Sequence, residues 1–427
     1  MSLLWHFYGA AARALSLLGL FPLACMLFGA LLYQKRSLSL PAVRVALAAG
    51  CWLICVYLLN ANRVASISAA PYLTRVLTVL LLCLPLGALF DAGCRMKVLR
   101  FLCWIWLVPV ACSAVLAVAL ALSGGSVILP NGLRAGVFTG YFEFFGNPNM
   151  YAMHCCLAFC LCLYLLFEQR RPALLALLAV AALALYAALV VTNCRSAILS
   201  VFPVVFLYGA AAVSTRLPGK RLVIRLLLGA LAGAALCLLL LLALRGMLFL
   251  LEHVRSGSGA AVPAASSFVD LQSMGLRVTI YRYALSRFGE AWDLILRGAT
   301  PVPAYDMFLD PAMPYSNLHS AYLAILLYYG LPGLLLFLAF ILYLAVCSCR
   351  LLFSRQPATP LSERCLPVLL LPILAINAVE EMLFARNFMS SAGVLLAIIG
   401  GYVVVLAREQ AARRAAPEAA ASGGPRP

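Results

Sequence analysis

Residues 173–191 read ALLALLAVAALALYAALVV, a stretch without a single charged side chain. A helix of about 20 apolar residues is long enough to cross the roughly 30 Å hydrocarbon core of a bilayer. Because hydrocarbon offers no partner to the peptide groups, such a segment crosses only as a helix or as part of a closed barrel. The apolar character is continuous and does not alternate from residue to residue, so the sequence predicts a transmembrane helix.

Comparable apolar segments recur along all 427 residues, of which 65% are hydrophobic and 11% are charged. This composition cannot cover a set of water-exposed domains, so lipid must be the main solvent. We therefore predict an all-α polytopic transmembrane bundle with about eleven or twelve spans. The apolar segments lie near residues 14–33, 45–60, 76–90, 101–122, 149–167, 173–191, 196–213, 226–244, 319–349, 365–379 and 391–407.

The basic residues are dispersed in short clusters between the apolar segments, although the formal net charge is +17. This dispersal argues against a nucleic-acid partner and matches the excess of Lys and Arg on cytoplasmic connections. The clusters fall on every second connection, which leaves Arg195, Glu143, residues 245–317 and Arg386 on the opposite, periplasmic side. Pro22 interrupts the first apolar segment, so the side of the N-terminus stays open. The cytoplasmic clusters are Lys35/Arg36/Arg44, Arg95/Lys97/Arg100, Arg170/Arg171, Arg216/Lys220/Arg221/Arg225, Arg350/Arg355/Arg364 and Arg408/Arg413/Arg414.

The chain divides into four parts on this pattern. Residues 1–244 form the N-terminal transmembrane helices, and residues 245–318 form a long periplasmic loop with surface helices. Residues 319–407 form the C-terminal transmembrane helices, and residues 408–427 a disordered cytoplasmic tail. A connection of this length within a helical bundle is usually functional or disordered, so the long loop is where we expect part of the chemistry.

The segment 319–349 is too long for one ordinary span and is interrupted by Gly330, Pro332 and Gly333. Proline removes a backbone donor and clashes with the preceding helical turn. We therefore predict a short helix at the outer surface, followed by a crossing helix.

An amphipathic surface helix is predicted over residues 275–292 of the long loop, because its apolar side chains recur at helical spacing. Its arginines Arg277, Arg282 and Arg287 follow one another at five-residue steps, each turned by about 140° from the last, so the three cannot share one ligand. Arg277 lies on the face of Tyr281 and is the arginine that we expect to point toward the bundle. The alternative for each arginine is an anchor to lipid headgroups.

Two further polar residues stand next to apolar segments. Arg195, in VVTNCRSAIL, has apolar runs on both sides, so its side chain either extends to the membrane surface or faces a polar cavity. His319, in YSNLHSAYL, precedes an apolar helix at the outer surface. Imidazole is the side chain best suited to proton transfer near neutral pH, whereas a lone histidine is more often a structural hydrogen-bonding group.

Together these residues indicate an outward-facing cavity with guanidinium groups and one candidate base. Guanidinium groups match phosphate oxygens, so the expected ligand is a phosphate or pyrophosphate at the outer leaflet. The long loop has no Asp-x-Asp pair, no His-x-x-x-His and no carboxylate cluster suited to Mg²⁺ or Mn²⁺. We therefore expect a metal-independent reaction on an anionic lipid, without a cofactor.

Five strings, in this order and spacing, resemble the O-antigen ligase and O-antigen polymerase superfamily. The resemblance covers the second two-thirds of the chain. At two positions the sequence departs from the family pattern, since Tyr281 stands where tryptophan is common and Ser320 where asparagine is common. The strings are GNPNM (146–150), TNCRSA (192–197), GLRVTIYRYAL (275–285), NLHSAYL (317–323) and YYGLPG (328–333).

The resemblance implies a GT-C-like glycosyltransferase of the cell inner membrane that acts in lipopolysaccharide biosynthesis. Such an enzyme takes a glycan from undecaprenyl pyrophosphate at the periplasmic face, and for the ligases the acceptor is the lipid A core. Residue by residue, the resemblance implies that Arg195 and Arg277 hold the pyrophosphate and that His319 activates the acceptor hydroxyl. Arg282 is a third candidate for the pyrophosphate.

Two other functions stay open at this point. An O-antigen polymerase of the same superfamily would use a second lipid-linked glycan as acceptor. A transporter or flippase would also contain many helices and a central arginine, but the sequence shows no inverted repeat and no paired broken helices, and transporters seldom have one long outer loop.

Overall fold

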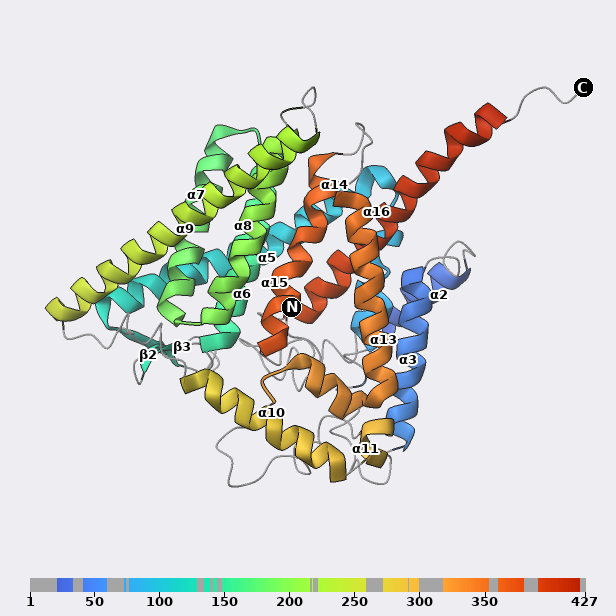
Figure 1. Ribbon diagram of the computed structural model, residues 1–427, viewed down its shortest axis with the longest axis horizontal. Coiled ribbons are helices and arrows are strands. Elements are labelled where there is room, and N and C mark those ends of the chain that lie inside the picture. The colour runs from blue at the N-terminus through green and yellow to red at the C-terminus, as the bar shows by residue number, and fades with distance from the viewer. Residues whose placement is uncertain are drawn as a thin grey trace, which may run out of the picture.

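The computed structural model describes residues 21–33, 41–59, 73, 77–128, 134–138, 141–143, 148–215, 217, 222–258, 272–290, 292–298, 318–352, 360–379 and 391–422. These residues form a bundle of helices with one small sheet (Figure 1). The helices are α2 (Phe21–Tyr33), α3 (Pro41–Leu59), η3 (Val79–Cys83), η4 (Leu86–Ala88), α5 (Ala92–Ser123), α6 (Pro148–Glu168), α7 (Pro172–Thr192), α8 (Arg195–Thr215), α9 (Leu222–Ser258), α10 (Gln272–Glu290), α11 (Trp292–Arg297), α13 (Ala321–Leu352), α14 (Leu361–Cys365), η6 (Leu366–Leu369), α15 (Leu370–Val379) and α16 (Ser391–Ser422).

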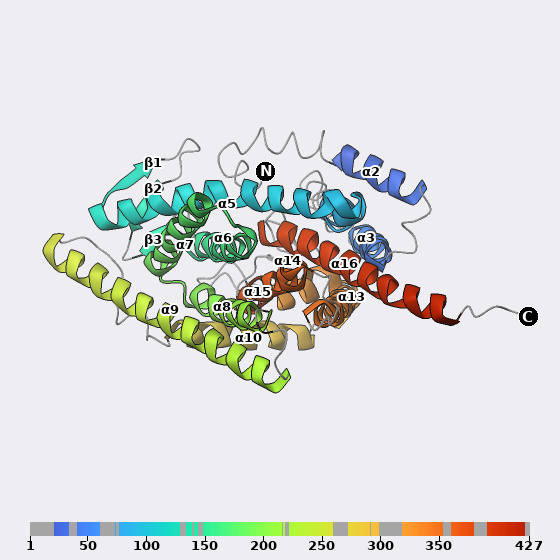
Figure 2. The same cartoon turned by 90° about the horizontal axis from the view of Figure 1, so that it is seen from above.

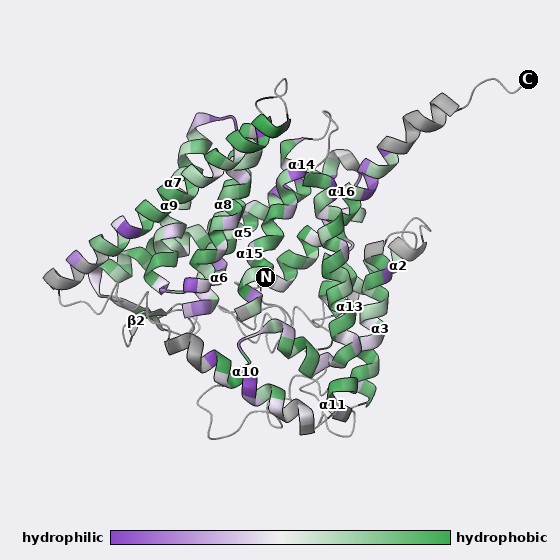
Figure 3. Cartoon of the chain, in the orientation of Figure 1, coloured by the Kyte–Doolittle hydropathy of each residue, from purple (hydrophilic) through white to green (hydrophobic). Residues whose placement is uncertain are grey.

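The predicted all-α polytopic bundle is confirmed. Within the described ranges, eight helices are long and apolar enough to cross a membrane, and shorter apolar helices occupy residues 43–59 and 79–88. Each of the eleven apolar segments predicted from the sequence has an apolar helical counterpart. The hydropathy colouring in Figure 3 shows apolar residues along the crossing helices, whereas α10 carries polar residues between apolar ones.

The stretch 173–191 lies within α7, which begins at Pro172 and ends before Asn193. Pro172 occupies the first turn, where its missing N–H is not needed. Asn193 takes a left-handed conformation, φ 54°, and its N–H bonds to the carbonyl of Val190. The hydroxyl of Tyr186 donates to the carbonyl of Leu240 in α9 at 3.1 Å. The one polar side-chain group of this stretch therefore has a partner inside the bundle.

Helices α8 and α9 pack backbone against backbone through glycines. A methyl group on Gly233 would stand 2.5 Å from the carbonyl oxygen of Phe206, and one on Gly229 would stand 2.8 Å from that of Ala210. Gly229 and Gly233 form a G-x-x-x-G pattern, which lets two helices approach closely. Close packing matters in a membrane because the hydrophobic effect does not drive helices together in lipid. Figure 2 shows α9 and α5 along opposite sides of the central helices.

The bundle has two chemically different ends. The C-terminal ends of α6, α8 and α13 lie at one end, which we call the inner end (Figure 1). Arg170 and Arg171 follow α6 there, and Arg350 lies in the last turn of α13. The N-terminal ends of the same three helices, together with α10 and α11, lie at the opposite outer end (Figure 1). This arrangement follows the alternation of basic connections that the sequence predicted.

Some boundaries differ from those expected. The boundary expected at residues 244–245 falls inside α9, which continues to Ser258. The tail expected to be disordered from Arg408 is helical through Ser422 as part of α16, and residues 423–427 lie outside the described ranges. Its alanine-rich sequence favours helix, and Gln410 is buried against the bundle.

A small antiparallel sheet, absent from the sequence prediction, joins α5 to α6. Its strands are β1 (Ser126–Ile128), β2 (Arg134–Phe138) and β3 (Tyr141–Glu143), in the order β1-β2-β3. Val127 pairs with Ala135, and Val137 pairs with Phe142. The strands are short, so period-two alternation carries little signal in the sequence.

At the inner end, Arg95 joins the η4–α5 corner to α16. Its side chain is 5% exposed. Its Nε donates to the carbonyl of Gly87 at 2.6 Å and one terminal nitrogen donates to that of Phe90 at 2.8 Å. The other terminal nitrogen lies 2.6 Å from Oε1 of Glu409. One guanidinium therefore donates to two carbonyl groups and forms an ion pair with one carboxylate.

We predict that Arg95→Met destabilises the protein, because it leaves two carbonyls and a carboxylate without their partner. Leaving a buried acceptor without its partner costs about 1–3 kcal/mol. Thermal unfolding in detergent, followed by tryptophan fluorescence, should show a clearly lowered Tm. Lys97→Met, on an exposed position of the same helix, is the matched control. Equal Tm values for both variants would contradict this role of Arg95.

Candidate functional site

Helix α10 presents one packed face and one exposed face at the outer end. The sequence predicted an amphipathic helix over 275–292, and α10 (Gln272–Glu290) confirms it. Ile280 and Ala284 are buried, while Arg277 and Tyr281 are half-buried on the same face. Arg282 is exposed on another face. Arg277 therefore has the inward position expected of it, and Arg282 does not share that position. The side chain of Arg287 lies outside the described set.

His319 occupies a strained position immediately before α13. Its φ of 47° lies in the left-handed region, which costs a residue with a side chain roughly 1–2 kcal/mol. The neighbours Leu318 and Ser320 are buried, and His319 itself is half-buried. The carbonyl of Ser320 accepts the first helical hydrogen bond, from the N–H of Ala324 at 3.0 Å. Such strain persists only where the surroundings hold it, and it is common at functional sites.

Tyr281 connects α10 to His319. Its hydroxyl donates to the backbone carbonyl of His319 at 2.7 Å, across 38 residues of sequence. Arg277 lies one helical turn before Tyr281 on the same face. The structure thus brings α10 and His319 together directly. The sequence prediction did not include Tyr281 among the site residues, although its place one turn from Arg277 on the inward face was a usable signal.

The helix that follows His319 is broken at Gly330, which confirms the predicted interruption. Gly330 has φ 69° and ψ −179°, so Ala321–Tyr329 forms a separate half-helix. Gly298, after α11, packs against it: a methyl group on either glycine would stand 2.7 Å from backbone atoms of the other segment. The indole N–H of Trp52 donates to the carbonyl of Tyr329 at 2.7 Å. The half-helix is therefore held at its far end by α11 and by α3.

Arg195 is the first residue of α8 and reaches the outer end from a different part of the bundle. The left-handed Asn193 and the buried Cys194 form the sharp turn that separates α7 from α8. A cation at a helix N-terminus is disfavoured by the helix dipole, so helix stability does not explain an arginine here. The N-terminus of a helix and a guanidinium both attract anions. Arg195 is half-buried, as a ligand-binding side chain at a membrane boundary would be.

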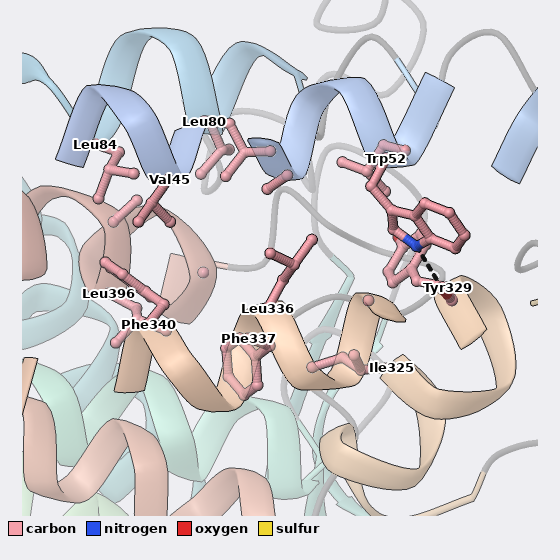
Figure 4. Close-up of a pocket in the computed structure, with 16 residues that line it drawn as sticks. Val45, Trp52, Leu80, Leu84, Ile325, Tyr329, Leu336, Phe337, Phe340 and Leu396 are labelled. Carbon is pink, nitrogen blue, oxygen red and sulfur yellow. Dashed lines mark hydrogen bonds between the residues drawn. The ribbon is translucent and has the colours of Figure 1, made fainter. Parts of the chain in front are cut away.

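An apolar cavity of about 90 Å³ lies beside the half-helix (Figure 4). Its walls come from α3, η3, α13 and α16. Two of its lining residues, Ile325 and Tyr329, belong to the half-helix that follows His319. The indole N–H of Trp52 is already bonded to the carbonyl of Tyr329 (Figure 4). A cavity of this kind suits hydrocarbon and not a polar ligand. The lining residues are Val45, Ala49, Trp52, Leu53, Val79, Leu80, Leu84, Ile325, Tyr329, Gly333, Leu336, Phe337, Phe340, Gly393, Leu396 and Ala397.

We predict that Gly298→Ala loosens the attachment of α11 to α13. The new methyl group would clash with the backbone at Tyr328–Gly330, and φ 75° at Gly298 disfavours any side chain. The conformational cost alone is about 1–2 kcal/mol. Hydrogen–deuterium exchange should accelerate in residues 292–298 and 321–329. Gly289→Ala, where a methyl group meets nothing within 4 Å, should leave the exchange unchanged. Protection equal to wild type in Gly298→Ala would refute the contact.

Comparison with known protein families identifies one matching region of the chain. Residues 180–338 match the family model described as O-antigen ligase. The matched range contains Arg195, the whole of α10, His319 and the break at Gly330. No curated protein and no solved structure matches the chain. This match of residues 180–338 supports membership of this multi-pass membrane protein in the O-antigen ligase/polymerase superfamily.

Proposed function

We propose that the protein is an O-antigen ligase that transfers the glycan of an undecaprenyl-pyrophosphate donor to the lipid A core at the periplasmic face of the inner membrane. Family membership gives glycan transfer in general terms. The observation that carries the finer proposal is the 2.7 Å hydrogen bond between Tyr281 and the His319 backbone. It ties the arginine-bearing face of α10 to the candidate base, at the end of the bundle opposite the basic connections.

The donor needs neutralisation of charge more than it needs a proton. Pyrophosphate is already a good leaving group, and its negative charge grows as the glycosidic bond breaks. Guanidinium groups placed at that charge stabilise the transition state. In the proposal, Arg277 binds from α10 and Arg195 binds from the N-terminus of α8, while no metal ion or cofactor takes part.

The acceptor needs a base. A sugar hydroxyl is a poor nucleophile at neutral pH, and the imidazole of His319 removes its proton as the oxygen attacks the anomeric carbon. The bond from that carbon to the pyrophosphate oxygen breaks in the same step, so the anomeric configuration inverts. The proton passes to the imidazole, and the negative charge passes to the pyrophosphate.

The apolar cavity supports a lipid substrate. It is lined mostly by apolar side chains and shares Ile325 and Tyr329 with the half-helix that begins after His319. A hydrocarbon chain in this cavity would leave its polar head near the outer end of the bundle. Placing two lipid-anchored reactants beside one another at that boundary contributes to the rate through proximity.

We expect His319→Ala to reduce transfer by a factor of about 10² to 10⁴, the usual loss for a general base. The variant should remain folded in the membrane, because His319 precedes a helix and lies outside any span. Transfer is measured with purified protein, lipid-linked glycan and lipid A core in proteoliposomes. His253→Ala, at an exposed position of α9, is the matched control. Near wild-type turnover by His319→Ala would remove the residue from the mechanism.

The same assay should proceed in excess EDTA, because the proposal stabilises the pyrophosphate with arginines alone. Activity that is lost in the chelator and restored by Mg²⁺ or Mn²⁺ would contradict the metal-independent scheme.

Arg195→Lys and Arg277→Lys should each weaken donor binding roughly tenfold or more, since a lysine cannot reproduce the paired hydrogen bonds of a guanidinium. The donor KM in the proteoliposome assay reports this change. Arg282→Lys is the comparison that decides which face of α10 binds the donor, because Arg282 is exposed. Normal donor binding by Arg277→Lys together with weak binding by Arg282→Lys would show that the donor uses the other face.

Deletion of the gene separates a ligase from a polymerase, the second candidate in this superfamily. We favour the ligase because the chain has a long outer loop whose helix α10 carries Arg277 and Arg282, and because its strings resemble that branch more closely. Loss of a ligase leaves bare lipid A core and long glycan on its undecaprenyl carrier. Loss of a polymerase leaves core carrying a single repeat unit. Electrophoresis of the lipopolysaccharide distinguishes the two patterns, and core plus one unit would overturn the ligase assignment.

A further inference from the structure

We propose that Tyr281 is a positioning residue: its hydrogen bond sets the backbone of His319 and couples that backbone to the donor-binding face of α10. The inference rests on the proposed function, in which His319 is the base and Arg277 binds the donor. The contact that carries it is the donation from the Tyr281 hydroxyl to the His319 carbonyl at 2.7 Å.

The backbone of His319 needs an external support. A left-handed φ of 47° is unfavourable for a histidine. The buried neighbours Leu318 and Ser320 fix the chain on both sides, and the tyrosine hydroxyl engages the carbonyl between them. The bond is accepted by the backbone and not by the imidazole. Tyr281 therefore orients the backbone of His319, and the two imidazole nitrogens take no part in this hydrogen bond.

The half-helix after His319 has further contacts at its far end and at Tyr322. The far end of this half-helix packs against Gly298. The carbonyl of Tyr329 at that end accepts a hydrogen bond from the indole N–H of Trp52 at 2.7 Å. The hydroxyl of Tyr322 lies 3.4 Å from the carbonyl of Leu374 in α15. The contacts of Trp52 and Leu374 come from the helices of the bundle, and that of Gly298 comes from the end of α11. The Tyr281 hydrogen bond at His319 comes from α10, so α10 helps to set the last dihedral angles before the base.

The same helix face carries the donor-binding residue. Arg277 precedes Tyr281 by four residues, one turn along α10, and both are half-buried beside the buried Ile280 and Ala284. A helix moves as a rigid element over one turn, so a shift of Arg277 on binding pyrophosphate also shifts the Tyr281 hydroxyl. Donor binding thereby adjusts the position of His319 for the acceptor.

Tyr281→Phe tests the hydrogen bond and keeps the ring packing. We expect kcat to fall roughly tenfold to 100-fold, the scale of a misplaced catalytic group, while the donor KM changes little. Tyr281→Trp retains an N–H donor and should recover part of kcat. Tyr283→Phe, two residues along α10 on a different face, should keep the wild-type kcat. Wild-type kcat in Tyr281→Phe would overturn the proposal.

A second measurement does not depend on turnover. Diethyl pyrocarbonate modifies exposed imidazoles, and mass spectrometry gives its rate at each histidine. Tyr281→Phe should change the rate at His319 and leave that at His253 unchanged. If the wild type shows no transfer but this change occurs, the positioning contact holds and the proposed function fails. A lowered Tm with parallel losses of donor binding and kcat, not recovered by Tyr281→Trp, would identify a purely structural contact and overturn the proposal.

Discussion

A peptide group without a hydrogen-bond partner in hydrocarbon costs several kcal/mol, and this constraint governs the whole molecule. It makes the crossing segments helical from end to end. It also limits where a helix can be broken. At Gly330 the break in α13 is accompanied by a side-chain donor, Trp52, on the carbonyl of Tyr329. At the η4–α5 corner, Arg95 supplies donors to the carbonyls of Gly87 and Phe90.

The polar side chains serve different purposes at the two ends of the bundle. At the inner end, Arg95 and Arg100 each lie 2.6 Å from a carboxylate oxygen, of Glu409 and Glu168 respectively. The first pair joins α5 to α16, which is distant in sequence, and the second joins the consecutive helices α5 and α6. At the outer end, Arg195 is the first residue of α8, and Arg277 lies on the packed face of α10. The 2.6 Å contacts give the first two arginines a structural role, and the ligand-binding role of Arg195 and Arg277 is our proposal.

Helix α10 links the substrate-binding and proton-transfer parts of the proposed mechanism. It lies across the outer end of the bundle (Figure 1) and contacts His319, two residues before α13, through Tyr281. The transmembrane helices hold the half-helix Ala321–Tyr329 as a fixed support. Helix α10 packs on that support through the buried Ile280 and Ala284 and is joined to it by the Tyr281 hydrogen bond.

The sequence by itself determined the helical bundle, the alternation of its charged ends, the surface helix and the break near Gly330. Each of these depends on local features: apolar run length, the spacing of charges, helical periodicity, and glycine and proline. It also singled out Arg195 and His319 from their places beside apolar segments, and Arg277 from its place on the inward face of the surface helix. The role of each stays a prediction.

Only the tertiary structure decided what those residues contact. The Tyr281–His319 hydrogen bond spans 38 residues, and the left-handed backbone at His319 depends on packing around it, so neither leaves a periodic trace in the sequence. The short strands between α5 and α6 are also too brief for a pattern. The helix that replaced the expected disorder after Arg408 is supported by the pairing of Glu409 with Arg95, a contact across more than 300 residues. Long-range pairing of this kind is decided by the whole fold. The paired groups are so far apart in the sequence that no short segment contains both of them.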